Sequence, residues 1–211
     1  MPKTHRIQLA LATGLAAVLL AACASAPSPS SEAGSSEGPV GLRAYFPAEA
    51  GYTWAYETMT ADHDEPGLAI LRVTATDERS ITFDNGNGPF TWQFDEAGIF
   101  RQESRSYILR EPIETGHTWR VGRNGRAEIV GIDSTIATPA GTFKHCVVVR
   151  EVEDEVGLEW WLAPGVGPVA VESWSSEDRE HNLVARAVLR SFVKEPIRVA
   201  RKDSGTRIEK P

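Results

Sequence analysis

The sequence has 211 residues, with 22 Lys and Arg against 29 Asp and Glu and a net charge of −7 at pH 7. This length fits one ordinary domain, and the acidic balance argues against nucleic-acid binding. Two cysteines are too few for a disulfide framework or for a zinc site made of several cysteines. The first 22 residues contain Lys3 and Arg6 and no acidic residue, so the remaining chain carries a net charge of −9.

The amino terminus has the pattern of a secretory signal. Lys3, His5 and Arg6 form a basic segment, and the 14 residues from Leu9 to Ala22 carry no charge. A membrane span needs about 20 apolar residues, so this stretch is too short to cross a bilayer. We therefore expect residues 1–22 to be a signal peptide.

The segment Leu20-Ala21-Ala22-Cys23 resembles the lipobox of bacterial lipoproteins. The resemblance implies that Cys23 is the lipidation site and holds the protein in the membrane through diacylglycerol and an acyl chain such as palmitate. Ala24, in place of Asp, implies transport to the outer membrane, facing the periplasm, if the cell is Gram-negative. The alternative is an ordinary signal peptide in which Cys23 is incidental.

Two segments lack the apolar content of a folded core. The stretch from Ala24 to Val40 holds six Ser, three Pro and a single Val, which predicts that residues 23–41 form a disordered tether. Residues 194–211 carry six basic and three acidic side chains and are expected to be a mobile, solvated tail, with contact to anionic lipid or peptidoglycan as the alternative. A single β domain is expected at residues 42–193.

Short runs of alternating apolar and polar residues predict an all-β domain with few, short helices. In the last run, Ala187 and Leu189 fall on one face of a strand, and Arg186 and Arg190 fall on the other. We expect an antiparallel flattened barrel or half-barrel of about 8–10 strands. The candidate strands are 53–58, 68–76, 80–84, 90–94, 99–109 with a break, 127–136, 143–152, 158–162, 169–174 and 183–193.

Three turns between these runs have the composition of hairpins. Asn85-Gly86-Asn87-Gly88 and Asn124-Gly125 are expected to supply the positive φ angles that tight hairpins require. Residues 153–155 predict a charged hairpin tip.

The chain contains an internal repeat. Residues 47–54 and 112–119 share five of eight residues at a spacing of 65, and each segment leads from a proline through a glycine to a tryptophan. Residues 90–99 and 158–166 form a second, weaker pair that places Trp92 opposite Trp160. Two related β units of about 65 residues that share one core are therefore expected, with convergent turn chemistry as the alternative.

Several segments resemble a family of bacterial envelope lipoproteins that includes TapB-like and related domains of unknown function. The resemblance rests on residues 45–47 with Gly51 and 54–56, on 138–143 with Cys146, and on 159–167. It implies a mainly β domain of the half-barrel or flattened-barrel kind, and it brings no catalytic residues.

The sequence offers no catalytic or metal site. Cys146 lies in an apolar run beside His145, and neighbours in a strand point to opposite faces, so Cys146 is expected to be a small core residue. The acidic stretch 62–65 is expected to be a solvated turn, and Gly86 stands where a calcium loop would need an oxygen ligand. We expect no catalytic residue, no metal and no cofactor, although a pair of carboxylates meeting in a cleft stays open.

The leading hypothesis is a non-enzymatic, membrane-anchored envelope protein that binds an apolar small ligand or a partner protein. Trp160 and Trp161 are adjacent, so one is expected to face inward and the other outward. Together with Trp92 they are the candidate ligand-binding residues. The alternatives are a structural or assembly accessory of an envelope complex with a filled core and, less favoured, an envelope hydrolase.

Overall fold

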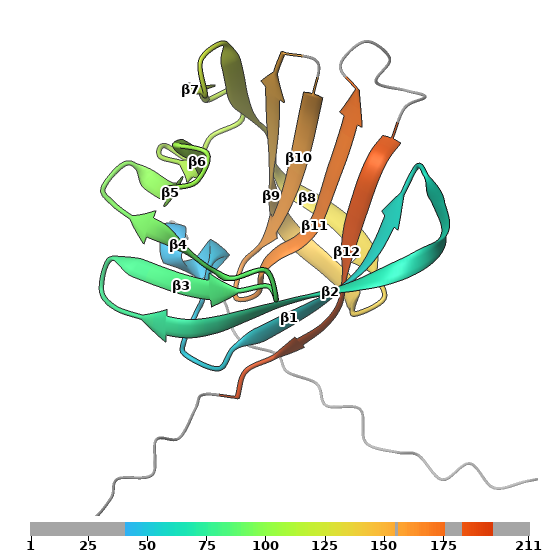
Figure 1. Cartoon of the computed structure of the whole chain (residues 1–211). Coiled ribbons are helices and arrows are strands. Elements are labelled where there is room, and N and C mark those ends of the chain that lie inside the picture. Colours follow the sequence, from blue (N-terminus) through green and yellow to red (C-terminus); the bar gives the residue numbers. More distant parts are fainter. Residues whose placement is uncertain (1–40, 155, 176–182, 196–211) are drawn as a thin grey trace, which may run out of the picture. The chain divides into compact units, whose positions relative to one another are not determined.

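The computed structural model describes residues 41–154, 156–175 and 183–195 (Figure 1). The predicted signal peptide, Cys23, the tether up to Val40 and the tail from Pro196 onward lie outside these residues. The described part contains a 3-10 helix, η1 (Leu42–Tyr45), followed by strands. The strands are β1 (Thr53–Thr60), β2 (His63–Thr76), β3 (Ser80–Asp84), β4 (Pro89–Phe94), β5 (Gly98–Arg101), β6 (Ser106–Arg110), β7 (Thr118–Val121), β8 (Gly125–Thr138), β9 (Gly141–Glu153), β10 (Val156–Ala163), β11 (Gly167–Ser175) and β12 (Leu183–Val193).

The strands form one antiparallel sheet that curls into a nearly closed barrel (Figure 1). The order is β6-β5-β4-β3-β2-β1-β12-β11-β10-β9-β8-β7, so β1 pairs with β12 and the sheet ends at β6 and β7. The predicted all-β barrel is confirmed. The barrel has twelve strands, more than the expected 8–10. The predicted run 99–109 divides into β5 and β6, and the four-residue β7 was not predicted because it is too short to show a clear alternation.

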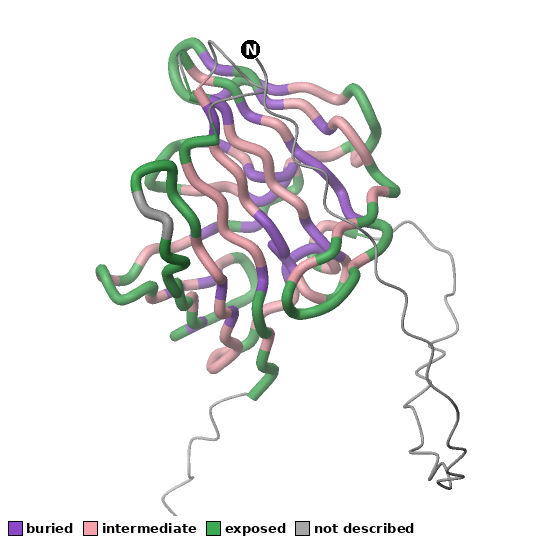
Figure 2. Tube along the Cα trace, turned by 90° about the vertical axis from the view of Figure 1, so that its right-hand side faces the viewer, coloured by how far each residue is buried: buried purple, intermediate pink, exposed green. Residues whose placement is uncertain are grey.

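Alternation along the strands sets the interior of the barrel. In β1, Trp54 and Tyr56 are buried while their neighbours are half-buried. Figure 2 shows buried positions in the middle of the strands and exposed positions at the hairpin ends. The same two-residue period was the basis for the predicted strands, and it holds because successive side chains of a pleated strand point to opposite faces.

An aromatic cluster fills the part of the barrel next to η1. Phe46, which follows η1, is 1% exposed and packs with its ring centroid 4.8 Å from Trp92, 5.8 Å from Phe83 and 6.0 Å from Trp54. The Trp54 indole N–H donates a 2.8 Å hydrogen bond to the Val166 carbonyl. The chain entering the domain therefore closes this region of the interior with its own side chains.

The two halves of the barrel repeat each other, six strands and six strands. Gly51 has φ 98° and its N–H donates to Val73, whose own N–H donates to the Tyr52 carbonyl. Gly116 has φ 88° and forms the same pair of bonds with Ile129 and His117. Trp54 and Trp119 then lie in the first strand of each half, and Trp92 and Trp160 in the fourth. The predicted two-unit organisation is thus present in the turns and the strand order.

The β8–β9 hairpin reaches across to β12. The Ala140 N–H, at the tip of this hairpin, donates a 3.0 Å hydrogen bond to the Leu189 carbonyl. On the adjoining outer face of the sheet, Trp161 pairs with Val148 and Ala170, both of which are buried. Around the half-buried Trp161, this outer face is therefore largely covered.

Hairpin turns follow the predicted chemistry with one correction. Gly86 and Gly88 have φ 90° and 118°, as expected for the β3–β4 turn. In the β7–β8 turn, the positive φ lies at Gly122, at 53°, and not at Asn124-Gly125. Gly125 already belongs to β8, where its backbone is extended, so the predicted position of the turn was wrong by a few residues. In the predicted charged tip at residues 153–155, Asp154 has φ 50°, and Glu155 lies outside the described residues.

No helix among the described residues is both long enough and apolar enough to cross a membrane.

Candidate functional site

Three cavities of the barrel share lining residues. The largest, of about 700 Å³, opens at the β9–β10 tip and is lined by Val121, Glu151, Glu153, Asp154, Val156 and Leu158. Leu158 also lines a cavity of about 240 Å³, which shares Val171 and Ala187 with a third of about 190 Å³. We call these three cavities together the lumen. It runs from an acidic mouth to an apolar inner end.

The inner end of the lumen is apolar. Its lining consists of Tyr56, Leu71, Phe90, Trp92, Trp160, Pro168, Val171 and Ala187. Leu71, Phe90, Trp160, Val171 and Ala187 face inward and yet remain only half-buried. Interior apolar side chains that other side chains do not cover are the usual lining of a site for an apolar ligand.

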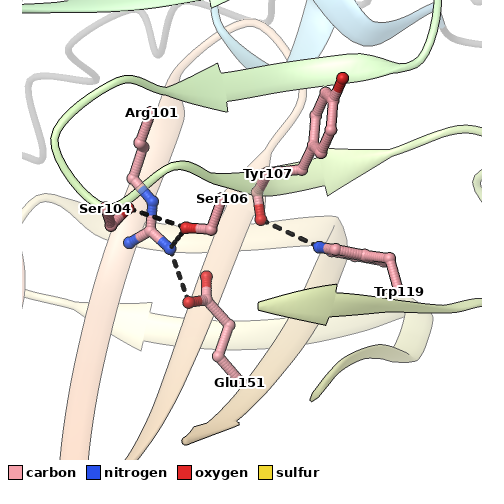
Figure 3. Close-up of polar contacts among 6 residues, drawn as sticks. All are labelled: Arg101, Ser104, Ser106, Tyr107, Trp119 and Glu151. Carbon is pink, nitrogen blue, oxygen red and sulfur yellow. Dashed lines mark hydrogen bonds and ion pairs between the residues drawn. The ribbon is translucent and has the colours of Figure 1, made fainter. Parts of the chain in front are cut away.

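A buried ion pair crosses the lumen between β5 and β9 (Figure 3). Arg101 Nη2 lies 2.6 Å from Glu151 Oε2, and the two side chains are only 12% and 5% exposed. The same Arg101 nitrogen donates to Ser106 Oγ at 2.7 Å, and Ser106 Oγ lies 2.7 Å from Ser104 Oγ. Residues of the β5–β6 hairpin are thereby tied to the opposite wall.

Burial raises the pKa of Glu151, although Arg101 opposes this effect through its charge and its hydrogen bond. The indole N–H of Trp160 lies close enough to Glu151 to lower its pKa, but it makes no hydrogen bond of normal geometry with that carboxylate. The Arg101 guanidinium carbon lies 5.3 Å from the centroid of the Trp160 ring. Three charged or polar groups therefore gather between the acidic mouth and the apolar inner end of the lumen.

Three polar atoms of this cluster have no hydrogen-bond partner within the described residues. They are Arg101 Nε, Glu151 Oε1 and Trp160 Nε1, and all three are buried. A buried polar atom without a partner costs roughly 1–3 kcal/mol, so such atoms call for an explanation in a native fold.

A second interaction joins β6 to β7, the two ends of the sheet. The Trp119 indole N–H donates a 3.1 Å hydrogen bond to the Tyr107 carbonyl (Figure 3). Side chains thus link the two strands that end the sheet order, at the place where the barrel is not closed by strand pairing.

The candidate ligand-binding tryptophans lie on two different faces. Trp92 and Trp160 both line the inner end of the lumen, with their ring centroids 6.4 Å apart in an edge-to-face arrangement. Trp161 lies on the covered outer face and lines none of the three cavities. Adjacent residues of β10 therefore do face opposite ways, as expected.

The other predicted positions have no counterpart in the lumen. Cys146 is fully buried and His145 is exposed, with its Nδ1 2.6 Å from Asp133 Oδ1 on the surface. Asp62 and Glu65 are exposed. Among the described residues, no three His, Cys, Asp or Glu side chains are grouped as metal ligands would be.

Sequence reasoning did not single out Arg101 or Glu151. A signal was present for Glu151, because it follows Val147 and Val149 at two-residue spacing and so belongs to the same inward face of β9. An acidic residue at a core position of a strand is unusual enough to mark a site. Nothing in the sequence pairs it with Arg101, which lies 50 residues earlier.

No protein-family model matches the chain, and no curated protein matches it. The resemblance to TapB-like domains therefore stays a resemblance of motifs. The fold is similar to that of a Bacteroides fragilis NCTC 9343 protein, inferred to be exported and having a YmcC-like fold, with TM-score 0.45 and 16% identity over 71% of this chain and 98% of that one. It is also similar to a Parabacteroides distasonis ATCC 8503 protein, inferred to be a lipoprotein, with TM-score 0.42 and 16% identity over the same shares of each chain. At these scores, no property of either protein is transferred to this one.

Proposed function

We propose that this protein is a lipid-anchored protein of the bacterial cell envelope whose barrel binds an apolar small ligand in the lumen. The observation that carries the proposal is the lumen itself, with inward-facing apolar side chains that remain half-buried at its inner end. The predicted anchor at Cys23 would hold this site beside a membrane, which is a source of apolar molecules.

The chemistry of the lining supports binding more than catalysis. The inner end presents aromatic and aliphatic side chains, and burial of such surface contributes about 25 cal/mol per Å² of apolar area removed from water. The thiol of Cys146 is not available as a nucleophile, because burial raises its pKa to about 11.

A structural accessory of an envelope complex is the second candidate. The aromatic cluster around Phe46 supports it, because this cluster fills the part of the barrel next to η1 without any ligand. Such a protein would act through its surface and would bind no small molecule in the lumen.

The two candidates differ in the outcome of a binding experiment. The full chain carrying Cys23→Ala, which removes the predicted acyl anchor, is titrated with the apolar fluorophore N-phenyl-1-naphthylamine. We expect saturable binding, and we expect Ala187→Leu to weaken it by about tenfold, because each methylene excluded from the lumen forfeits about 0.8 kcal/mol. Ala187 lines both inner cavities.

Ala137→Leu is the matched control, because Ala137 is exposed in β8 and the chemical change is the same. Its affinity for the fluorophore should equal that of the parent chain. Absence of saturable binding in the parent chain would favour the structural accessory.

The anchor is tested separately in cells. We expect the wild-type chain to incorporate labelled palmitate and to sediment with membranes, and we expect Cys23→Ala to lose both properties. Palmitate labelling that persists in Cys23→Ala would contradict the lipobox interpretation.

A further inference from the structure

Arg101, Glu151 and Trp160 form a polar cluster in the lumen, and each has one buried atom without a hydrogen-bond partner among the described residues. Arg101 Nε and Trp160 Nε1 are N–H donors, and Glu151 Oε1 is an acceptor. Glu151 is 4% exposed, and its other oxygen is engaged by Arg101 at 2.6 Å. The unused capacity of the cluster is therefore two donors and one acceptor.

A hydroxyl group matches this pattern. A hydroxyl supplies one donor and two acceptor lone pairs, which complement the two N–H groups and the carboxylate oxygen. A carboxylate has no proton to donate and would place a second negative charge beside Glu151 in a buried site. An ammonium group has no lone pair for the two N–H groups and would face the charge of Arg101.

The position of the cluster indicates which kind of molecule would carry the hydroxyl group. Glu151 lines the mouth of the lumen, and Trp160 lines its apolar inner end. A group bound between them would project an apolar chain into the inner cavity, against Leu71, Phe90 and Trp92. The mouth adds Glu153 and Asp154, whose negative charges disfavour the approach of anions.

We propose that Arg101, Glu151 and Trp160 form a recognition site for the hydroxyl group of a neutral amphiphile, and that the lumen selects such a molecule over a fatty-acid anion of the same chain length. This inference rests on the proposed function, since it requires that the lumen take up an apolar chain. It adds the class of headgroup, which the apolar lining alone does not determine.

The experiment compares three probes that share a twelve-carbon chain: 1-dodecanol, dodecanoate and dodecylammonium. Each displaces N-phenyl-1-naphthylamine from the full chain carrying Cys23→Ala at neutral pH, below the critical micelle concentration. We expect 1-dodecanol to bind about tenfold more tightly than either charged probe, since each hydrogen bond that satisfies a buried atom contributes on the order of 1 kcal/mol. Equal affinities for the three probes would overturn the proposal.

Two variants assign the selectivity to the cluster. Trp160→Phe removes the N–H and keeps an aromatic ring at the lining of the inner cavity, and we expect it to weaken 1-dodecanol about fivefold more than it weakens the fluorophore. Trp161→Phe is the matched control, because its side chain lies on the covered outer face, and it should change neither affinity. Glu151→Gln keeps the shape of the side chain and should bring dodecanoate to within about threefold of 1-dodecanol by removing the repelling charge.

The outcomes separate this inference from the function on which it rests. If the fluorophore does not bind, the lumen is not a binding site and both fail. If the fluorophore binds and Ala187→Leu weakens it, while Trp160→Phe and Glu151→Gln leave the ranking of the three probes unchanged, the lumen binds apolar ligands and the hydroxyl site is refuted. Water would then be the partner of the three buried atoms.

Discussion

Cys146 and His145 show how one residue step along a strand separates two chemical environments. Cys146 is fully buried, and burial raises the pKa of its thiol from 9.0 to about 11. His145 is exposed and pairs with Asp133. His145 has φ 57° where the β8–β9 pairing is irregular, so the two adjacent side chains lie in different environments, and the thiol has a role in packing.

The Cys146 thiol is expected to be unreactive in the folded protein. In the Cys23→Ala chain it is the only thiol, so labelling with a disulfide reagent reports on it alone. We expect labelling at pH 8 to require unfolding and to become fast in denaturant. Rapid stoichiometric labelling without denaturant would contradict the burial.

The same residue makes stability depend on pH in the alkaline range. Between pH 9 and about pH 11 the unfolded thiol ionises while the folded thiol stays protonated, so the unfolded state binds fewer protons and stability falls as the pH rises. Cys146→Ala should lose this component of the pH dependence. Chemical unfolding at several pH values measures it.

The buried Arg101–Glu151 ion pair is expected to contribute little to the stability of the fold. A buried ion pair is weak evidence for stability, because the cost of removing two charges from water offsets most of their attraction. Arg101 Nε and Glu151 Oε1 have no hydrogen-bond partner among the described residues, and this further reduces what the pair can contribute to stability. The proposed hydroxyl site would supply partners for these atoms.

At the scale of elements, the repeated turn before β1 and β7 is the feature that organises the barrel. In each copy a glycine with positive φ begins a pair of backbone hydrogen bonds to the second strand of its half, β2 or β8, and a buried tryptophan comes three residues later. Each indole N–H then donates to a backbone carbonyl, Val166 for Trp54 and Tyr107 for Trp119. The two copies thus place equivalent anchors at the start of each six-strand half.

Substitutions at equivalent positions of the two turns are expected to have similar effects. Gly51→Ala and Gly116→Ala should each destabilise by more than about 1 kcal/mol, because a β-carbon disfavours the positive φ at both positions. Trp54→Ala and Trp119→Ala should each cost about 3–5 kcal/mol, the range for a large aromatic side chain in a packed core. Chemical denaturation of the four variants measures these free energies.

Gly41→Ala is the control, because Gly41 has φ −68° and nothing lies within 4 Å of an added β-carbon. It should be nearly neutral. A severe effect in one copy of the turn with a neutral effect in the other would show that the two segments are not structural equivalents.

At the scale of the whole domain, the barrel is closed by two kinds of interaction. Backbone pairing runs from β6 through β1 and β12 to β7. Between β6 and β7, the Trp119–Tyr107 hydrogen bond makes the link, and the Arg101–Glu151 pair ties β5 to β9 near by. The lumen lies beside these links, because side chains that bridge the walls do not pack the interior as the aromatic cluster around Phe46 does.

The sequence by itself determined the features that arise from short stretches of chain. The two-residue alternation identified most strands, the Pro-to-Gly segments identified the repeated turn, and adjacency placed Trp160 and Trp161 on opposite faces. Each depends on local geometry, in which a pleated strand alternates its side chains and a glycine adopts a positive φ. Tertiary structure alone decided that Arg101 meets Glu151 and that Trp92 meets Trp160 across a lumen. Such contacts depend on the number of strands and on how the sheet closes, and neither is encoded in the pattern of any single strand.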